Sequence, residues 1–375
     1  MKGWERKTLG EVCVVDKRQG IYKGLPYVGL EHIESRTGRF VGSTEPLGVK
    51  SSTFKFSPEH VLYGRLRPYL SKVMLPDFTG HCSTEIFPLK PRPELTREFL
   101  QYWFLRDATV EQIDATSTGA RMPRADMNAV LDLEFPLPPL AEQRRIVSIL
   151  DEAFEGIATA KANAEKNLQN ARALFESHLQ SVFSQRGEGW VETTVDQIST
   201  NLDSKRVPIT KSDRTSGEYR YYGASGIVDY VADYIFDGDA LLVSEDGANL
   251  LMRSTPIAFS VSGKYWVNNH AHILKFENMP TQRFVEFYLE SIKLDEYIRG
   301  AAQPKLTQAA LNSIPIPIPK SAHARAAIVE SIESILAETQ RLASIYERKL
   351  AALEALKKSL LDQAFSGKLN RGLHG

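Results

Sequence analysis

The sequence of 375 residues is poor in cysteine, has no excess of charge and contains no long apolar run. Its two cysteines, Cys13 and Cys82, cannot build a disulfide scaffold, so we expect a cytoplasmic protein. The 46 lysines and arginines equal the 46 aspartates and glutamates. This balance argues against an indiscriminate nucleic-acid binder but leaves room for local basic patches. We find no apolar stretch long enough to span a membrane and no signal peptide pattern at the start.

The sequence also lacks the motifs of several enzyme classes. It contains no Asn/Asp-Pro-Pro-Tyr/Phe motif of an adenine methyltransferase and no Gly-x4-Gly-Lys-Ser/Thr phosphate loop. Asp77 and Glu85 resemble part of a nuclease site, but no lysine follows at the spacing that such a site needs. His270 and His272 are spaced to bind a metal ion from one face of a strand. The internal repeat places Glu85 and Phe87 at the equivalent positions, so we expect ordinary strand histidines, no metal site and no catalytic residue.

Two proline-rich segments mark the joints of the sequence. Residues 135–139 (FPLPP) and residues 314–319 (IPIPIP) each run directly into a long helical pattern. Proline has a fixed φ and no backbone N–H, so such a run fits a sheet edge or a helix start but not the interior of either. Two copies of one joint predict two copies of one module.

A repeat extends over most of the sequence. Residues 4–9 match residues 190–195, an offset of 186 (190 minus 4), and residues 119–124 match residues 300–305, an offset of 181 (300 minus 119). Small loop insertions account for the drift in the offset. A period this long excludes a solenoid and predicts a tandem duplication.

Each copy mixes short strands with a helix, so we predict an α+β fold with two pseudo-symmetric globules and two long helices. In the first copy, the apolar face of Phe99, Trp103 and Val110 predicts one helix from Thr96 to about Ile113. The second copy predicts a corresponding helix from Thr281. The expected segments are a first globule (1–140), a first long helix (141–186), a second globule (187–319), a second long helix (320–366) and a C-terminal tail (367–375).

The two long helices carry matching apolar seams. Positions from Ile146 to Val182 repeat at alternating spacings of four and three, and positions from Ile328 to Ala364 repeat in the same register 182 residues later. This period belongs to coiled coils, and small alanines in one seam with larger residues in the other predict that the two helices pack on each other within one chain. The pseudo-twofold symmetry of the repeat predicts that they run antiparallel. The alternative is two ordinary amphipathic helices on a core. About 40 helical residues span ~60 Å, so we expect a rod that spaces the globules for a two-part DNA target.

Five segments carry a further pattern: residues 25–33 (LPYVGLEHI), 62–70 (LYGRLRPYL), 135–146 (FPLPPLAEQRRI), 222–227 (YGASGI) and 241–248 (LLVSEDGA). Together with the duplicated layout, they give the whole chain a resemblance to the specificity subunit of a type I restriction–modification system. The last two segments look like the second common type of target domain in that family. One departure is that residues 320–325 read KSAHAR where residues 139–144 read PLAEQR, which weakens the second helix start as a partner-binding surface.

The resemblance implies a non-catalytic, DNA-binding subunit. Each globule would be a target-recognition domain for one half of a split double-stranded DNA site, and the paired helices would dock two methyltransferase subunits. A restriction and translocase subunit would join for cleavage. The resemblance places S-adenosylmethionine, Mg and ATP in these partners and no cofactor in this chain. The residues expected to dock partners lie at the starts of the long helices: Glu142, Gln143, Arg144, Arg145 and Arg325.

Cations are the candidates for DNA contact. Arg65 and Arg67 flank a strand end, where an arginine can pair bidentately with guanine or with phosphate. The turn at residues 119–124 and 300–305 ends in a cation in both copies, which favours phosphate positioning. The alternatives are a solvated loop and a turn that merely feeds the next strand. The candidates for DNA contact are Lys17, Arg18, Arg36, Arg65, Arg67, Tyr69, Arg121, Arg124, Lys205, Arg206, Lys211, Arg214, Arg253 and Lys305.

Other functions stay open on the sequence alone. One is a coiled-coil adaptor without a DNA role, which predicts no salt-dependent DNA binding, whereas phosphate contacts require a steep salt dependence. Another is the specificity chain of a related adenine methyltransferase that lacks a nuclease. A third, a methyltransferase or nuclease in its own right, conflicts with the missing motifs. Base-reading loops carry no motif, so the sequence does not identify the target bases or the spacer length.

Overall fold

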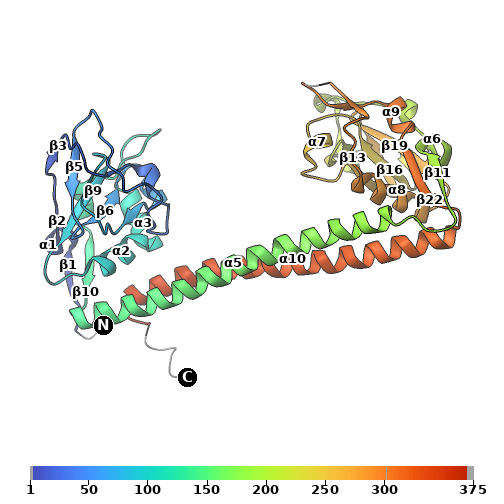
Figure 1. Cartoon of the computed structure of the whole chain (residues 1–375). Coiled ribbons are helices and arrows are strands. Elements are labelled where there is room, and N and C mark those ends of the chain that lie inside the picture. Colours follow the sequence, from blue (N-terminus) through green and yellow to red (C-terminus); the bar gives the residue numbers. More distant parts are fainter. Residues whose placement is uncertain (1–2, 301, 370–375) are drawn as a thin grey trace. The chain divides into compact units, whose positions relative to one another are not determined.

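The computed structural model describes residues 3–300 and 302–369 of the chain. The chain divides into two compact units. Unit 1 comprises Met1–Glu165 and Arg348–Gly375, and unit 2 comprises Lys166–Glu347. Each unit therefore contains a globule and part of each long helix (Figure 1).

Unit 1 contains two four-stranded sheets and one two-stranded sheet. The first sheet has the order β2-β9-β6-β7 and is antiparallel throughout. The second has the order β3-β5-β8-β4, in which β4 runs parallel to β8. The strands are β1 (Glu5–Thr8), β2 (Cys13–Val15), β3 (Gln19–Gly20), β4 (Tyr27–Val28), β5 (Thr53–Phe56), β6 (Val61–Gly64), β7 (Val73–Met74), β8 (Gly80–Cys82), β9 (Ile86–Pro91) and β10 (Glu134–Leu137). Cys13 and Cys82 lie in β2 and β8, buried and unpaired.

The helices of unit 1 correct one prediction. Thr96 caps α2 as expected, because its hydroxyl accepts the N–H of Phe99 at 3.3 Å. The single helix predicted as far as Ile113 is wrong, because Arg106 adopts extended backbone angles and divides it into α2 and α3. Arg106 also donates to Asp362 at 2.8 Å, which fixes the break. The helices are α1 (Leu9–Val12), η1 (Leu30–His32), η2 (Pro68–Leu70), α2 (Arg97–Leu105), α3 (Asp107–Asp114) and α4 (Met127–Leu131).

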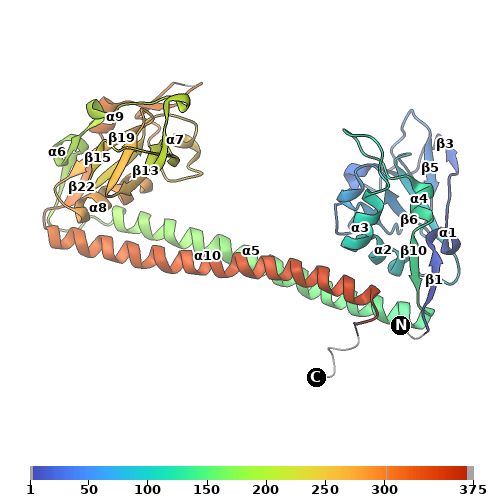
Figure 2. The same cartoon turned by 180° about the vertical axis from the view of Figure 1, so that it is seen from behind.

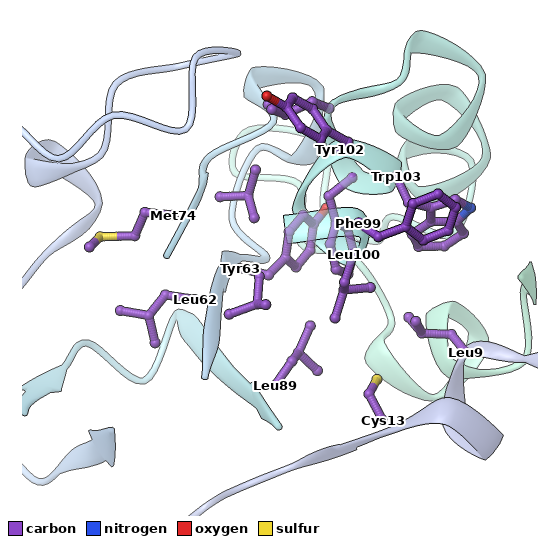
Figure 3. Close-up of a cluster of buried hydrophobic side chains, with 14 of the residues drawn as sticks. Leu9, Cys13, Leu62, Tyr63, Met74, Leu89, Phe99, Leu100, Tyr102 and Trp103 are labelled. Atoms are coloured by element: carbon purple, nitrogen blue, oxygen red, sulfur yellow. The ribbon is translucent and has the colours of Figure 1, made fainter. Parts of the chain in front are cut away.

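Helix α2 carries much of the core of unit 1 (Figure 3). Phe99, Trp103 and Phe104 are almost completely buried, and the ring of Phe104 stacks on Tyr63 of β6 with centroids 4.4 Å apart. Truncation of a buried aromatic side chain to alanine typically costs about 3–5 kcal/mol. The apolar face that the sequence predicts for this helix is thus what anchors it to the sheet.

Unit 2 repeats the strand order of the first sheet of unit 1. Its antiparallel sheet β12-β19-β16-β17 corresponds to β2-β9-β6-β7. Its second sheet has the order β14-β13-β18-β15, with β13 parallel to β18. The strands are β11 (Trp190–Thr194), β12 (Ser199–Asn201), β13 (Ser216–Gly223), β14 (Gly226–Val231), β15 (Phe236–Asp237), β16 (Ala240–Ser244), β17 (Ala258–Val261), β18 (Lys264–Val267), β19 (Ala271–Phe276), β20 (Ile298–Arg299), β21 (Lys305–Leu306) and β22 (Pro315–Pro319).

The helices of unit 2 follow the same plan. Helix α8 packs on β16, β17 and β19 of the first sheet. Its N-cap is Asn278, whose side chain accepts the N–H of Thr281, so the helix begins two residues before the predicted start. The helices are α6 (Val195–Ile198), η3 (Asp203–Lys205), η4 (Lys211–Asp213), α7 (Asn249–Met252), α8 (Met279–Ser291) and α9 (Gln308–Asn312).

The proline-rich joints form edge strands, as predicted. In unit 1, β10 pairs antiparallel with β1, and in unit 2 the three prolines of β22 pair across to β11. Proline cannot donate to a sheet ladder, so a two-stranded sheet accommodates it. A long helix follows each joint: α5 (Leu140–Ser184) and α10 (Ala322–Phe365).

In unit 1, α5 and α10 run in opposite directions side by side (Figures 1 and 2). Ile146 of α5 belongs to the same apolar cluster as Phe365 near the end of α10. Further along α5, Lys161 bonds to Glu354 at 2.8 Å. Since the partner number falls as the α5 number rises, the pair is antiparallel.

The helix ends in unit 2 pack in the same manner. Arg172 of α5 lies 3.6 Å from Glu347 of α10, and Phe183 shares an apolar cluster with Ile332. The predicted fold class is thus confirmed: two α+β globules with two long helices paired antiparallel. No described helix is both long enough and apolar enough to cross a membrane.

Candidate nucleic-acid interface

In unit 1, the chain that leaves β6 lies against the turn of residues 118–124. Paired backbone hydrogen bonds of 3.0 Å between the first and last residues close this turn. The N–H of Arg67 donates to the carbonyl of Pro123 at 2.7 Å, and the N–H of Ala125 donates to Arg65 at 2.9 Å. Arginines from two separate sequence segments therefore become neighbours on one surface.

Glu85 binds two of these arginines. Its carboxylate accepts from Nε of Arg65 at 3.1 Å and from Nε of Arg124 at 2.9 Å. The Arg65 guanidinium also lies 5.3 Å from the ring centroid of Phe87. We call Arg65, Glu85 and Arg124 the unit 1 brace, because they tie the strand end to the turn. A phosphate near Arg65 or Arg124 would compete with Glu85 for the guanidinium.

Other side chains beside the brace face solvent. Arg67 and Arg121 are exposed, and within the described part of the chain their guanidinium groups make no hydrogen bond or ion pair. Tyr69 and Met122 are also exposed, at 42% and 45%. Free cations beside exposed aromatic and apolar side chains suit a surface that meets nucleic acid.

The remaining cations predicted in unit 1 differ in their freedom. Lys17 is exposed above an aromatic ring, 5.1 Å from its centroid. Arg18 binds Asp16 through Nε at 2.9 Å, and Arg36 binds Asp107 at 2.6 Å. Burial would raise the pKa of Asp16, but hydrogen bonds from Arg18 and a histidine hold it below its usual value. Of these three cations, Lys17 is therefore the freest to approach a phosphate.

In unit 2, the chain after β16 makes the same approach to residues 304–306. The N–H of Gly247 donates to Pro304 at 3.0 Å, and the N–H of Leu306 donates to Glu245 at 2.8 Å. Here a carboxylate, Glu245, occupies the position that Arg65 has in unit 1. Glu245 binds Lys305 of the turn at 3.0 Å.

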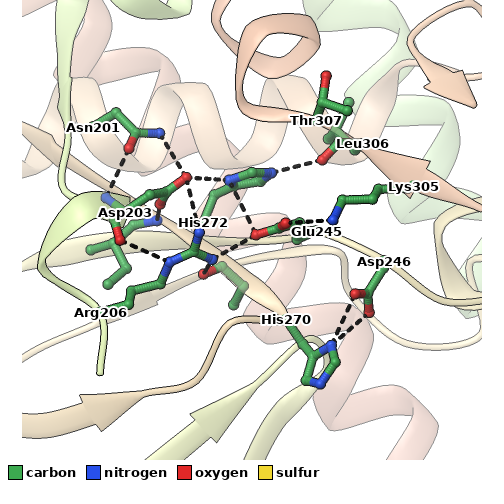
Figure 4. A network of polar contacts seen from close by, with 12 residues as sticks. Asn201, Asp203, Arg206, Glu245, Asp246, His270, His272, Lys305, Leu306 and Thr307 are labelled. Atoms are coloured by element: carbon green, nitrogen blue, oxygen red, sulfur yellow. Dashed lines mark hydrogen bonds and ion pairs between the residues drawn. The ribbon is translucent and has the colours of Figure 1, made fainter. Parts of the chain in front are cut away.

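Glu245 is part of a polar network that we call the unit 2 network: Asp203, Arg206, Glu245, His272 and Lys305 (Figure 4). Nδ1 of His272 lies 2.5 Å from a carboxylate oxygen of Asp203, and Nε2 of that ring lies 2.8 Å from the carbonyl oxygen of Leu306. Both nitrogens of the ring therefore face oxygen atoms. Arg206 bonds to Glu245 at 2.6 Å, and its side chain is 14% exposed.

The pKa shifts in the unit 2 network agree with paired charges. Burial would raise the pKa of Asp203, but hydrogen bonds from His272 and a backbone N–H lower it below its usual value. Burial would likewise raise the pKa of Glu245, yet hydrogen bonds from Arg206 and Lys305 lower it. Both carboxylates are therefore ionised near neutral pH.

The unit 2 network also contains the three groups of the described chain that are spaced to hold a metal ion. Asp203, Glu245 and His272 offer ligand atoms within 4.8 Å of one another. These atoms already bind Arg206, Lys305 and each other, so a divalent ion would meet the two positive side chains of Arg206 and Lys305. The two histidines that the sequence pairs do not converge, because His270 binds Asp246 at 2.9 Å instead. The donor set fits a salt-bridge network rather than a metal site.

The other cations predicted in unit 2 are partly committed to structure. Arg214 pairs with Asp229 at 3.1 Å, and Arg253 donates to two carbonyls at the end of α8 at 3.3 and 2.8 Å. Lys205 and Lys211 are exposed, and their ammonium groups make no hydrogen bond or ion pair among the residues that the structure describes. DNA contact by any of the candidate residues stays a prediction.

At the start of α5, Glu142 and Arg145 form a two-bonded ion pair at 2.8 Å. The hydrogen bonds from Arg145 lower the pKa of Glu142 below its usual value. Arg144 points to solvent. These three side chains therefore lie where a partner can reach them.

Gln143 lies in the interior of unit 1, not on a docking surface. Its side chain is fully buried, accepts from the N–H of Thr96 at 2.9 Å and donates to the carbonyls of Glu94 and Pro138 at 2.8 Å. In the register of the helix seams, Arg325 lies 182 residues after Gln143, and it donates to two carbonyls of its joint at 2.8 and 3.0 Å. This position locks the joint in each unit, a role that the sequence reading did not foresee.

Sequence reasoning also missed Asp203 and Glu245 as partners of the cations. The repeat identifies Arg124 and Lys305 because both end the same turn. It does not identify their carboxylates, because Glu85 precedes β9 while Glu245 follows β16. The signal available was an acidic residue directly beside a buried strand, where a charge needs a partner.

Comparison with protein families gives a consistent match. The family model of the type I restriction modification DNA specificity domain matches twice, over residues 1–169 and 187–347. A Haemophilus influenzae protein named as a type I restriction enzyme specificity subunit, S.HindORF215P, is 38% identical over 125 residues, which cover 33% of this chain and 32% of that protein. The type I restriction enzyme EcoDI specificity subunit of Escherichia coli is 29% identical over 171 residues, 44% of this chain and 37% of the relative. The matched parts thus span about a third of these relatives.

Solved structures show the same fold. A chain from a structure on complex assembly and conformational transition of the type I R-M system aligns with a TM-score of 0.80 and 20% identity, over 98% of this chain and 99% of that one. The HsdS subunit from Thermoanaerobacter tengcongensis aligns with a TM-score of 0.65 and 20% identity, over 98% of each chain.

Proposed function

Because the chain belongs to the type I restriction modification DNA specificity family, we propose that it recognises a two-part DNA sequence on behalf of partner subunits. Unit 1 would read one half-site and unit 2 the other. The observation that carries this proposal is the duplication. Two matches to a DNA specificity domain fall on two units whose first sheets share one strand order.

Side-chain charges support DNA contact by both units. Unit 1 exposes Arg67 and Arg121 beside its brace, and unit 2 exposes Lys205 and Lys211; no described residue forms an ion pair with these four side chains. The formal net charge of the chain is nevertheless zero, so these local cations act without a general positive field. We therefore expect tight DNA binding to need partner subunits that close around the duplex.

We expect no catalytic step in this chain. The partners would be two methyltransferase subunits, and for cleavage a restriction and translocase subunit, with S-adenosylmethionine, Mg and ATP bound by those partners. The starts of α5 and α10 are the expected docking surfaces. Glu142, Arg144 and Arg145 are the accessible residues there in unit 1, whereas buried Gln143 is not.

The test is to delete the gene for this chain in its native cell and to map methylated adenine across the genome by single-molecule sequencing. We expect methylation at one split motif, lost on deletion and restored by the wild-type gene. A methylation pattern unchanged by the deletion would contradict the proposal and leave an adaptor without a DNA role.

A second measurement tests the contact itself. DNA binding by the assembled complex should weaken steeply with salt, because each phosphate contact releases a counterion. An affinity independent of salt concentration would argue against phosphate contacts from this chain or its partners.

A further inference from the structure

In both units the backbone bends at an equivalent residue, shortly after β6 in unit 1 and after β16 in unit 2. That residue is Arg67 in unit 1, with φ +52°, and Gly247 in unit 2, with φ +105°. Both donate their N–H to the proline of the facing turn, Pro123 at 2.7 Å and Pro304 at 3.0 Å. The fold thus requires a left-handed backbone at this place in both units.

Glycine suits this conformation, and arginine does not. A side chain at positive φ strains the backbone, whereas glycine adopts this conformation freely. A Cβ built on Gly247 meets no atom within 4 Å, so the backbone angle and not a lack of space favours glycine there. The backbone at Arg67 is therefore strained, and the equivalent Gly247 of unit 2 avoids this strain. We expect the arginine side chain to make a favourable interaction that offsets it.

The offsetting interaction is not a contact of the Arg67 side chain within the described part of its own unit. The structure describes two further arginines at positive φ, and both use the guanidinium inside their own unit. Arg36 binds Asp107 and the carbonyl of Tyr69, while Arg253 binds carbonyls at the end of α8. The Arg67 guanidinium is exposed and makes no such contact within the described ranges.

The surroundings hold Arg67 in a fixed position. The unit 1 brace ties Arg65, which lies two residues before the bend, to Arg124 of the facing turn. Pro68 follows and is buried, with its ring setting the next φ. A rigid base that presents an unpaired planar fork suits a directional contact, since little freedom remains to be lost on binding.

We propose that Arg67 reads a guanine in the DNA half-site bound by unit 1. The inference rests on the proposed function of the chain. Arginine pairs bidentately with O6 and N7 of guanine in the major groove, which is the most frequent specific contact of this kind. A phosphate contact needs charge alone, and Arg121 supplies charge from the neighbouring turn without a strained backbone.

The test substitutes the unit 2 residue into unit 1 in the full complex. Arg67→Gly removes the fork and relieves the strain, so the melting temperature should hold or rise. At one base pair of one half-site, discrimination for guanine should fall by about 5- to 150-fold, the usual range for one bidentate pair. Arg67→Lys should relax the same position, because lysine keeps the charge but not the fork. Selection of binding sites from a randomised half-site measures this.

Arg121→Ala is the matched control, because it removes one charge from the same surface. It should weaken binding about equally for all sequences. If Arg67→Gly also weakens all sequences equally, Arg67 contacts phosphate and the inference is wrong. If the variant lowers the melting temperature, or leaves guanine preference unchanged beside a wild-type split motif, the inference is wrong while the proposed function stands. If the wild-type complex selects no split motif, both the inference on Arg67 and the proposed function are wrong.

Discussion

The two units hold the same turn with opposite arrangements of charge. In unit 1, the strand end carries the cation Arg65, and Glu85 reaches across from the start of β9 to bind it and Arg124. In unit 2, the strand end carries the carboxylate, and Glu245 binds Lys305 of the turn directly. In both units a carboxylate therefore binds the cation of the turn. The carboxylate comes from the start of β9 in unit 1 and from the end of β16 in unit 2.

The two arrangements also differ in burial. Glu85 of the unit 1 brace is 23% exposed, and its two arginines are more exposed still. Glu245 is 12% exposed, Asp203 5% and His272 1%. Unit 1 thus leaves its cations within reach of a ligand, whereas unit 2 encloses most of its charges. The charges beside the turn are thus accessible in unit 1, whereas most of them are buried in unit 2, where we expect them to contribute more to stability.

The largest expected effect tests this difference in stability. Glu245→Gln removes the main charge partner of Arg206, whose side chain is 14% exposed, and of the half-exposed Lys305. The loss at the largely buried Arg206 should dominate and cost about 3 kcal/mol. Glu85→Gln breaks partly exposed pairs and should cost about 1 kcal/mol or less. Hydrogen exchange followed by mass spectrometry on β16 and β6 resolves the two units. Equal losses in both would show that burial does not separate them.

The pH dependence of the Glu245→Gln effect sharpens the comparison. The folded state lowers the pKa of Glu245 below its ordinary value of 4.5, so the stabilising contribution is fully present above pH 4.5 and declines as the pH falls through the folded pKa. Denaturant unfolding of wild type and variant at pH 7, 4.5 and 3 measures this. The difference in unfolding free energy should be constant from pH 7 to 4.5 and smaller at pH 3. A penalty that grows on acidification contradicts the assignment.

The joints offer a second matched pair of positions. Gln143→Ala leaves the N–H of Thr96 and two carbonyls without partners in the interior of unit 1, which should cost about 2 kcal/mol. Arg325→Ala removes bonds to partly exposed carbonyls, so unit 2 should lose about 1 kcal/mol or less. Exchange of amides at the N-terminus of α2 reports the first change. A larger loss in unit 2 would reverse the proposed order.

Periodic and repeated features of the chain could be predicted from the sequence. The apolar seams predicted both long helices, because apolar residues recur at coiled-coil spacing over many turns. The proline-rich joints predicted edge strands, because proline cannot donate a hydrogen bond inside a sheet. The break at Arg106 escaped, since it depends on extended backbone angles and a bond to Asp362, which lies 256 residues away in sequence.

The sequence identified the cations of the candidate interface, but not which of them are already bound to other residues of the fold. Arg67, Arg121, Arg206 and Arg253 look alike in sequence, yet the first two guanidinium groups have no partner among the described residues and the last two are bound within the fold. Whether a guanidinium is free depends on carboxylates and carbonyls that approach from distant strands. A single sequence contains no local signal for such pairs.

The smallest expected effect concerns the paired helices. Lys161 bonds to Glu354 at 2.8 Å in unit 1, whereas Arg172 lies 3.6 Å from Glu347 in unit 2. All four side chains are about half exposed or more, so solvent screens both pairs. A double-mutant cycle to alanine should give a coupling of about 0.5 kcal/mol for the first pair and about 0.2 kcal/mol or less for the second. Both should shrink in 1 M salt. Larger couplings that persist in salt would show that these ion pairs stabilise the helix pair, in place of buried seam residues such as Ala164.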